Sequence, residues 1–191
     1  MSADTLSAFV ANAEDHHATV HRVAPHAVTG TVADLIDPPA VGVRLPHGLD
    51  FPDAVATDPT PADLDAANTG VTAARLAIAD YGTVVLESDA AGSEAVSLFP
   101  ERHVAVVRAA DVVPGMREAM AALGDRLREG ASAVLATGPS ATADMGDLVI
   151  GAHGPREVDV VLVESDGGGG EPGAADARGD DVAVDGGDAD E

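Results

Sequence analysis

Side chains that could hold or react with a small anion are concentrated between Ala136 and Val163. Two Gly-Pro turns, Gly138-Pro139 and Gly154-Pro155, each lie next to an apolar run. Hydroxyl, carboxylate and imidazole groups stand between the turns and belong to Ser140, Thr142, Asp144 and His153. A strand, a glycine turn and a Ser/Thr-rich helix start form a cradle whose free N–H groups and helix dipole attract anions. The pattern therefore predicts where a ligand binds, but not which reaction follows.

The first turn is predicted to join the end of a strand at Thr137 to the start of a helix. Gly138 supplies the bend, and Ser140 or Thr142 occupies the expected N-cap position. Donors at this point would converge on a carboxylate or phosphate, although the same hydroxyls could simply cap the helix. Asp144 would lie in the first helical turn, where it acts on a substrate only if a proton lies within reach.

The second turn runs from Gly151 to Pro155 and leads into the last apolar run. Its residues allow a sharp bend, which could aim the His153 imidazole into a cleft for proton transfer or for hydrogen bonding to an anion. A surface or structural histidine is the alternative. Arg156 could pair with a carboxylate ligand, but in so acidic a chain the favoured partner is an acid of the protein itself.

A third candidate lies at Asp80, which precedes Gly82 and Thr83 at a predicted strand start. This arrangement holds a carboxylate and a hydroxyl at a tight bend, although polar turns before strands are routine. No catalytic residue is assigned. The complete set of candidate ligand-binding residues is Asp80, Gly82, Thr83, Thr137, Gly138, Ser140, Thr142, Asp144, His153 and Gly154.

Four residues near the N-terminus raise the question of a metal site: Glu14, His16, His17 and His21. His17 and His21 are four apart, as on a helix face, but the β-branched residues between them indicate that the helix is already ending. Solvated histidines are therefore favoured over a metal site.

The elements that must position these residues alternate between strands and helices. Apolar runs predict strands at 20–23, 41–45, 83–87, 103–108, 133–137 and 158–164. Helical spacing and capping signals predict helices at 2–18, where Ser2 or Asp4 could cap, and at 31–36, 58–67 and 116–129. In the last helix Met120, Leu123 and Leu127 share one face, and Gly130 ends it.

This alternation predicts an α/β domain, a layered sheet flanked by helices. The runs at 133–137 and 158–164 are continuous and short, as in parallel strands buried on both faces. The domain is expected to span residues 1–164, with an irregular helical and loop part at 1–60. Residues 165–191 contain eight Gly and nine acids, so they are predicted to form a disordered acidic tail.

The charge balance is extreme, with 33 acids against 10 bases and a formal net charge of −23. All ten bases are Arg, and 23 of the acids are Asp. Such self-repulsion favours disorder in dilute buffer, yet the apolar residues form distinct runs. We therefore interpret the chain as a folded, halophilic protein, because the Debye length falls to about 3 Å at 1 M salt and repulsion is screened.

The melting temperature is accordingly expected to rise with KCl concentration from dilute buffer to multimolar salt. Screening of carboxylate repulsion and salt-strengthened apolar burial both act in this direction. Thermal unfolding followed by circular dichroism at a series of KCl concentrations measures the effect. An unchanged melting temperature across that series would contradict the halophilic interpretation.

Several classes of protein are disfavoured by composition. The absence of Cys removes disulfides, thiolate catalysis and Cys-ligated zinc or iron–sulfur clusters from this chain. No signal-peptide pattern opens the sequence and no apolar run approaches about 18 residues, so a cytoplasmic protein without a membrane span is expected. The acidic charge argues against nucleic acid, which requires a basic surface.

Five segments together resemble the LUD-domain family, and in particular its lactate-utilisation protein C group. The resemblance covers residues 60–164. The segments that carry it are Gly70-Val71-Thr72, Ala77–Asp80 with Gly82-Thr83, Ser97–Pro100 followed by His103-Val104, Thr137–Ser140 with Thr142-Ala143-Asp144, and Gly151 with His153-Gly154-Pro155.

The resemblance implies a fold similar to the ribose-phosphate isomerase, glucosamine-phosphate deaminase and CoA-transferase group. It also implies a role in oxidation of L-lactate to pyruvate, beside partners that carry the iron–sulfur clusters. No cofactor is expected on this chain, and its lack of Cys agrees with that division. The chain would contribute a small-anion pocket or a docking surface, and the resemblance assigns it no catalytic residue.

Two other functions stay open. The chain could be a stand-alone enzyme on a sugar phosphate or an acyl substrate, with Asp80, Asp144 or His153 as the base. It could also be a binding module for a small carboxylate that it does not convert.

Overall fold

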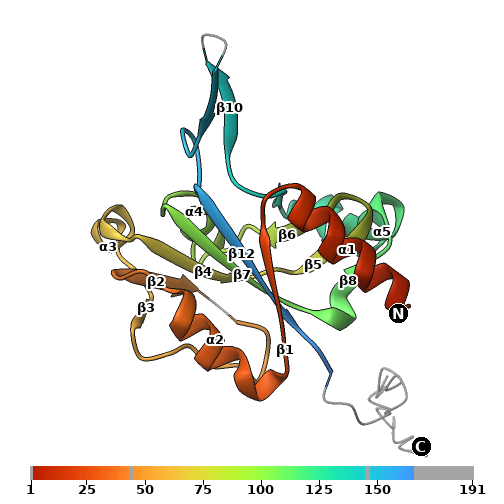
Figure 1. Ribbon diagram of the computed structural model, residues 1–191, viewed down its shortest axis with the longest axis horizontal. Helices are drawn as coiled ribbons and strands as arrows, with labels where there is room; N and C mark the ends of the chain where they lie inside the picture. The colour runs from red at the N-terminus through yellow and green to blue at the C-terminus, as the bar shows by residue number, and fades with distance from the viewer. Residues whose placement is uncertain (1, 44, 145–146, 166–191) are drawn as a thin grey trace, which may run out of the picture.

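A six-stranded parallel sheet forms the centre of the protein (Figure 1). The computed structural model describes residues 2–43, 45–144 and 147–165. The strand order is β1-β12-β7-β4-β2-β3. These strands are β1 (Thr19–Val23), β2 (Ala40–Val43), β3 (Val55–Thr57), β4 (Thr69–Ala73), β7 (Arg102–Arg108) and β12 (Glu157–Val163). The predicted α/β class is therefore confirmed, and β12 is parallel and buried as expected.

A second sheet of four strands has the order β8-β5-β6-β9. Its members are β5 (Leu76–Ile78), β6 (Thr83–Glu87), β8 (Val112–Val113) and β9 (Ala133–Ala136). The prediction of a parallel strand buried on both faces at 133–137 is wrong, because β9 lies at the edge of this sheet. Among the described strands it pairs with β6 alone, in antiparallel orientation, and its residues are half-buried or exposed.

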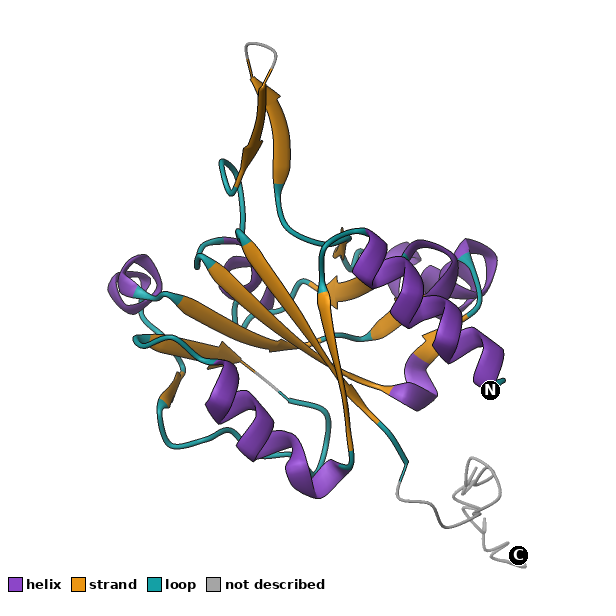
Figure 2. Ribbon diagram, viewed as in Figure 1, coloured by secondary structure: helices purple, strands orange, loops and turns teal. Residues whose placement is uncertain are grey.

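The described part of the chain contains five α-helices, which pack on and between the two sheets (Figure 2). They are α1 (Ala3–Asp15), α2 (Val28–Leu35), α3 (Pro61–Ala66), α4 (Ser93–Leu98) and α5 (Met116–Arg128), and single 3-10 turns lie at η1 (Pro25–Ala27), η2 (Ala79–Tyr81) and η3 (Ala109–Asp111). The Ser2 hydroxyl accepts the Asp4 N–H at 3.1 Å, which confirms the predicted cap of the first helix. None of the helices in this described part of the chain has the length and apolar character to cross a membrane.

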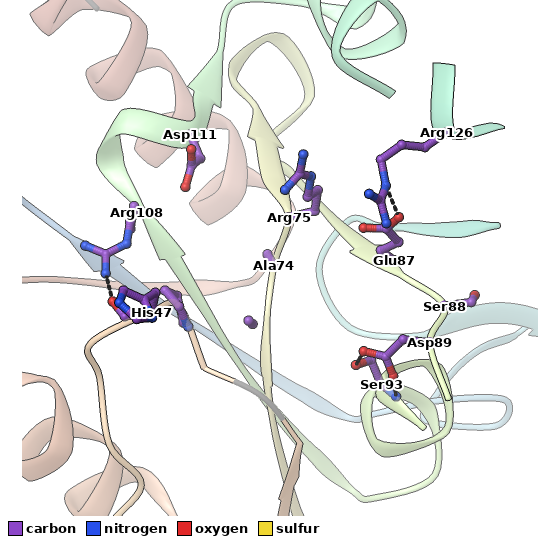
Figure 3. Close-up of a pocket in the computed structure, with 12 residues that line it drawn as sticks. His47, Ala74, Arg75, Glu87, Ser88, Asp89, Ser93, Arg108, Asp111 and Arg126 are labelled. Atoms are coloured by element: carbon purple, nitrogen blue, oxygen red, sulfur yellow. Dashed lines mark hydrogen bonds and ion pairs between the residues drawn. The ribbon is translucent and has the colours of Figure 1, made fainter. Parts of the chain in front are cut away.

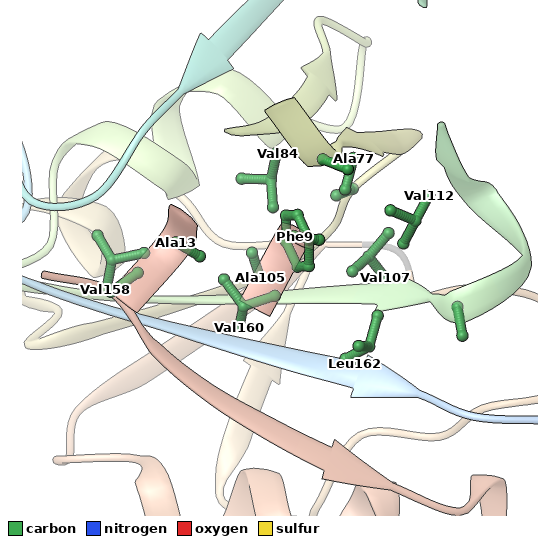
Figure 4. Close-up of a cluster of buried hydrophobic side chains, with 14 of the residues drawn as sticks. Phe9, Ala13, Ala77, Val84, Ala105, Val107, Val112, Val158, Val160 and Leu162 are labelled. Atoms are coloured by element: carbon green, nitrogen blue, oxygen red, sulfur yellow. The ribbon is translucent and has the colours of Figure 1, made fainter. Parts of the chain in front are cut away.

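The main core lies between the two sheets, where α1 is inserted (Figure 4). Phe9 and Ala13 of α1 are completely buried there. They pack against one face of β7 and β12 and against Ala77 and Val84 of the second sheet. The opposite face of the parallel sheet is covered by α2, whose Val28 and Val32 are also completely buried.

Helix α5 packs on the outer face of the second sheet, but not through the predicted stripe. Ala119 and Leu123 are buried against Leu76 and Ile78, whereas Met120 is 40% exposed and Leu127 is 38% exposed. The buried stripe therefore shares only Leu123 with the predicted face, and Ala119 is buried where Met120 and Leu127 were expected. Gly130 ends the helix with a positive φ of 97°, as expected.

A histidine lies in the middle of the parallel sheet. His103 of β7 is 1% exposed, and its Nε2 lies 2.8 Å from the hydroxyl oxygen of Thr72 on β4. Burial lowers the pKa of His103 to about 4. The imidazole is therefore neutral at physiological pH.

Helix α4 approaches β4 unusually closely. A Cβ placed on Gly70 of β4 would lie 2.0 Å from the Val96 carbonyl oxygen. Only glycine allows this distance, so the position of α4 on the sheet depends on Gly70.

Candidate functional site

A polar cleft of about 430 Å³ opens where the carboxyl ends of β4 and β7 meet the second sheet (Figure 3). Ligands of α/β proteins commonly bind at this edge of a parallel sheet. Three of the ten Arg residues of the chain line the cleft. His47 lines the cleft together with six charged residues, which are Arg75, Arg108, Arg126, Glu87, Asp89 and Asp111.

Arg75 lies where the chain crosses from one sheet to the other. The Ala74 N–H donates to Val106 of the parallel sheet at 2.8 Å, and the Arg75 N–H donates to Val85 of the second sheet at 2.8 Å. The backbone of Arg75 is thus fixed by both sheets, while its side chain is exposed. In Figure 3 its guanidinium lies between Asp111 and the Arg126–Glu87 pair.

The Arg75 side chain has no hydrogen bond or ion pair with any residue that the structure describes. Acids outnumber bases by about three to one in this chain, so an arginine without an acidic partner is unexpected. Arg117 on α5 is likewise unpaired within the described residues, but it lies outside the cleft.

Arg108 ends β7 and donates from Nη2 to the backbone carbonyl of His47. A carbonyl orients the guanidinium without neutralising its charge. Asp111, three residues further on, is the acid on which both Arg75 and Arg108 act. Burial raises the pKa of the Asp111 carboxyl, and the charges of Arg108 and Arg75 oppose that rise only in part.

The far side of the cleft is more nearly neutral. Arg126 of α5 forms an ion pair with Glu87 at the end of β6. The Asp89 carboxylate accepts hydrogen bonds from the backbone of Ala91 and from the Ser93 hydroxyl, the latter at 2.9 Å. Three arginines and three acids line the cleft, and Arg75 and Arg108 are the two of these arginines without an ion pair among the described residues, so they are the groups available to bind a carboxylate or phosphate.

Sequence reasoning missed this cleft. Arg75 stands alone in an alanine-rich segment, and Arg108 was assigned only as the last residue of a strand. One signal was present, because a base at the carboxyl end of a predicted parallel strand lies at the edge where ligands bind.

Four of the predicted site residues lie beside the C-terminal end of α1, and a fifth, Asp80, precedes them in the chain. The hydroxyls of Thr83 and Thr137 lie 2.6 Å apart. A Cβ on Gly82 would lie 2.2 Å from the Ala13 nitrogen, and one on Gly138 would lie 1.9 Å from the His16 carbonyl oxygen. These glycines therefore serve close packing against α1.

Asp80, the fifth, is exposed and faces a different element. Its Oδ2 would lie 2.8 Å from a Cβ on Gly115, the N-cap of α5. The carboxylate therefore points toward the N-terminal end of that helix, where its charge is stabilised.

The predicted helix after Ser140 is absent, and this prediction is wrong. The chain instead forms an antiparallel ribbon of β10 (Ala141–Asp144) and β11 (Asp147–Ile150). Consecutive apolar residues from Leu148 to Ile150 favour a strand there. Without a helix there is no dipole to attract an anion, so neither Ser140 nor Thr142 is an N-cap. Asp144 ends β10, and its side chain lies outside the described residues, as do Met145 and Gly146.

The two Gly-Pro turns lie side by side. The Ser140 N–H donates to Pro155 at 2.8 Å, and the Gly151 N–H donates to Ser140 at 2.9 Å. A Cβ on Gly154 would be 3.1 Å from the Ser140 Cβ. His153 is exposed and borders a separate hollow of about 410 Å³ beside Phe99. Ligand binding by these turns stays a prediction.

Two further polar candidates, Arg156 and His21, form ion pairs within the protein. Arg156 pairs with Glu101 at 2.8 Å, as predicted. His21 pairs through Nε2 with Asp159 at 2.8 Å, and Arg102 lies 3.2 Å from the other oxygen of that carboxylate. Within residues 2–43, 45–144 and 147–165, no group of three or more His, Asp or Glu side chains is arranged to hold a metal ion.

Comparisons with known proteins agree with this architecture. A family model described as the LUD domain matches residues 53–163. Lactate utilization protein C of Deinococcus radiodurans is 32% identical over 171 residues, which cover 84% of this chain and 80% of that protein. Lactate utilization protein C of Bacillus licheniformis is 37% identical over 117 residues, so this chain spans about half (49%) of that relative's length.

A solved structure has the same fold. The crystal structure of a DUF162 family protein from Deinococcus radiodurans superposes with a TM-score of 0.68 and 28% sequence identity. The match covers 85% of this chain and 99% of the solved chain.

Proposed function

The chain belongs to the LUD-domain family, and we propose that it is a component of an L-lactate utilisation system. It works beside iron–sulfur partner proteins in oxidising lactate to pyruvate, and it binds a small carboxylate in the arginine cleft. The names of its relatives support the lactate role. The arrangement of sheet and helices supports placing the fold in the ribose-phosphate isomerase, glucosamine-phosphate deaminase and CoA-transferase group.

One observation carries the binding role. Arg75 and Arg108 face one cleft, and neither forms an ion pair within 4 Å among the described residues, although Asp111 lies in the same cleft and interacts with both charges. Lactate and pyruvate each carry one carboxylate, which a guanidinium can bind through two parallel hydrogen bonds. A ligand of this kind supplies acceptor oxygens for Arg75 and for the donors of Arg108 that the His47 carbonyl does not engage.

The redox chemistry is assigned to the partners. Cluster ligation in such systems relies on Cys thiolates, and this chain contains none. Asp111 is the group in the cleft best suited to exchange a proton with a bound hydroxy acid, because burial raises the pKa of its carboxyl.

The size of the cleft favours a second candidate function. A lactate molecule has six heavy atoms, whereas pockets of about 300–1,000 Å³ typically hold drug-sized ligands, and this cleft measures about 430 Å³. A stand-alone enzyme or binding module for a larger carboxylate or a sugar phosphate would fill more of that volume.

Replacing Arg75 by alanine is expected to weaken binding of the anion by about tenfold to a hundredfold. Hydrogen bonds to charged groups contribute about 1.5–3 kcal/mol, and every 1.4 kcal/mol is a factor of ten in affinity. Isothermal titration calorimetry with L-lactate, pyruvate and inorganic phosphate measures the loss. Arg117→Ala is the matched control, because it removes the same charge from an exposed arginine outside the cleft.

Growth on L-lactate tests the cellular role in a strain that lacks the gene. The wild-type chain and Arg117→Ala are expected to restore growth on L-lactate, whereas Arg75→Ala is expected not to restore it. Ser140→Ala and His153→Ala are the corresponding variants of the two Gly-Pro turns, and normal growth of both would remove these turns as the essential site. Equal affinity of Arg75→Ala and Arg117→Ala in calorimetry would contradict binding in the cleft.

The partners are tested by pull-down of the tagged chain from a lysate prepared in high salt. Co-purification of cluster-binding proteins is expected, identified by mass spectrometry and by the absorption of iron–sulfur centres. Isolation of the chain alone, under conditions where it binds lactate, would favour the stand-alone function.

A further inference from the structure

The ribbon of β10 and β11 stands apart from the rest of the protein. It is hydrogen-bonded to neither of the larger sheets, and Figures 1 and 2 show it projecting from the amino end of β12. Its two strands pair Ala141 with Ile150, Thr142 with Val149, and Ala143 with Leu148. Among the described strands, none pairs with an outer edge of this ribbon, so both edges can accept another strand.

The two faces of the ribbon differ in chemistry. Side chains alternate along a strand, so Leu148 and Ile150 share a face with Ala141 and Ala143. The other face carries Thr142, Val149 and Asp147. One face is thus continuously apolar over the described residues.

This apolar face is exposed to solvent. Leu148 is 71% exposed, Ile150 is 41% exposed, and every residue of β11 is exposed. Eight large apolar side chains are exposed in the described part of the chain, and three of them are consecutive on β11. Near the base of the ribbon Phe99 is 70% exposed beside the hollow bordered by His153. Clustered exposure of this kind marks interaction surfaces.

A ribbon of two strands has little stability of its own. At its base, Ser140 donates to the Pro155 carbonyl and accepts from the Gly151 N–H. A surface that adds a strand to one edge and covers the apolar face would supply both the missing hydrogen bonds and the missing burial.

The charge of the chain indicates which kind of partner would bind the ribbon. Asp147 lies on the other face of the ribbon, Glu101 near the base is exposed and paired with Arg156, and the whole chain carries −23. A second copy would bring another −23 to the same place. A basic partner is electrostatically complementary, and its charges would pair with these carboxylates around the apolar contact.

We propose that the β10–β11 ribbon is a docking arm for a different protein, which presents an apolar strand flanked by Arg or Lys. The arm binds by strand addition, with Leu148 and Ile150 as its apolar anchors. This site is separate from the arginine cleft. The ribbon lies at the amino end of β12, and the cleft lies at the carboxyl ends of β4 and β7.

The test uses a twelve-residue peptide of alternating Val and Arg, labelled for fluorescence anisotropy, in 1 M KCl. At this salt concentration diffuse attraction to the acidic chain is screened. The wild-type chain is expected to bind it, and Leu148→Asp to lose at least about tenfold in affinity. Val149→Asp is the matched control, because it adds the same charge at the neighbouring position on the other face and should keep the affinity within about twofold.

Circular dichroism in the same buffer confirms that both variants fold, as the exposure of Leu148 leads us to expect. A peptide of alternating Val and Glu should not bind. Equal binding of the Val/Arg peptide by Leu148→Asp and the wild-type chain would overturn the proposal. So would light scattering that shows a wild-type dimer and a monomeric Leu148→Asp variant, because the occupant would then be a second copy. Neither measurement depends on lactate binding or growth, so the two proposals fail separately.

Discussion

Gly70→Ala is expected to destabilise the protein by about 3 kcal/mol or more, at the upper end of the cost of overpacking a core. The added Cβ would lie 2.0 Å from the carbonyl oxygen of Val96, a backbone atom that cannot rotate away. Helix α4 would have to leave its place on β4, and the buried Val96 would move with it. For a chain of this size the melting temperature should fall by about 6–12 °C.

Gly30→Ala is the matched control for that substitution. Gly30 lies on the exposed side of α2, and an added Cβ would meet nothing within 4 Å. Alanine is favoured over glycine inside a helix by about 0.5–1 kcal/mol, so a small gain is expected. Thermal unfolding of both variants in the same concentrated KCl gives the comparison. Equal melting temperatures for the two variants would show that α4 does not depend on Gly70.

Acidification is expected to remove about 3 kcal/mol of stability through His103 alone. The imidazole has a pKa of about 4 in the folded protein and 6.5 in the unfolded chain. Between these values the unfolded chain binds more protons, so the free energy of unfolding falls as pH decreases from about 6.5 to 4. Each unit of difference in pKa corresponds to about 1.36 kcal/mol, so this interval gives the expected loss of about 3 kcal/mol in the free energy of unfolding.

His103→Gln separates this contribution from that of the many carboxylates. Glutamine cannot titrate, but its amide can still form a hydrogen bond with the Thr72 hydroxyl. Urea unfolding of both proteins from pH 7 to pH 4 should show a smaller loss for the variant. Parallel curves would mean that His103 does not resist protonation in the folded state.

Local signals in the sequence predicted the helices and strands that carry strong patterns. Ser2 followed by apolar residues at helical spacing defined α1, and the continuous run at 158–164 defined β12 as a buried parallel strand. Strand β4 was missed because Gly70 interrupts its apolar run. The close approach of α4 requires a glycine at this position. Because α4 is distant in sequence, the structure is needed to explain why Gly70 interrupts the strand.

The error at Ser140 has a similar origin. Hydroxyl and acidic residues after a Gly-Pro turn are typical of a helix start, but the segment pairs with Leu148–Ile150 and becomes a strand. The arginine cleft could not be predicted for another reason. Arg75 and Arg108 are 33 positions apart, and only the pairing of β4 with β7 brings their strand ends together.

The parallel sheet separates the projecting ribbon from the arginine cleft by the length of β7, which at about 3.3 Å per residue is roughly 20 Å. Electrostatic influence decays over about 8 Å at physiological ionic strength, and faster in brine. Binding of a partner at the ribbon should therefore leave the affinity of the cleft for its ligand unaltered, and the reverse, unless the sheet itself deforms. A complex assembled on the ribbon would keep the cleft open to the bulk, so small molecules could enter and leave during the lifetime of the assembly.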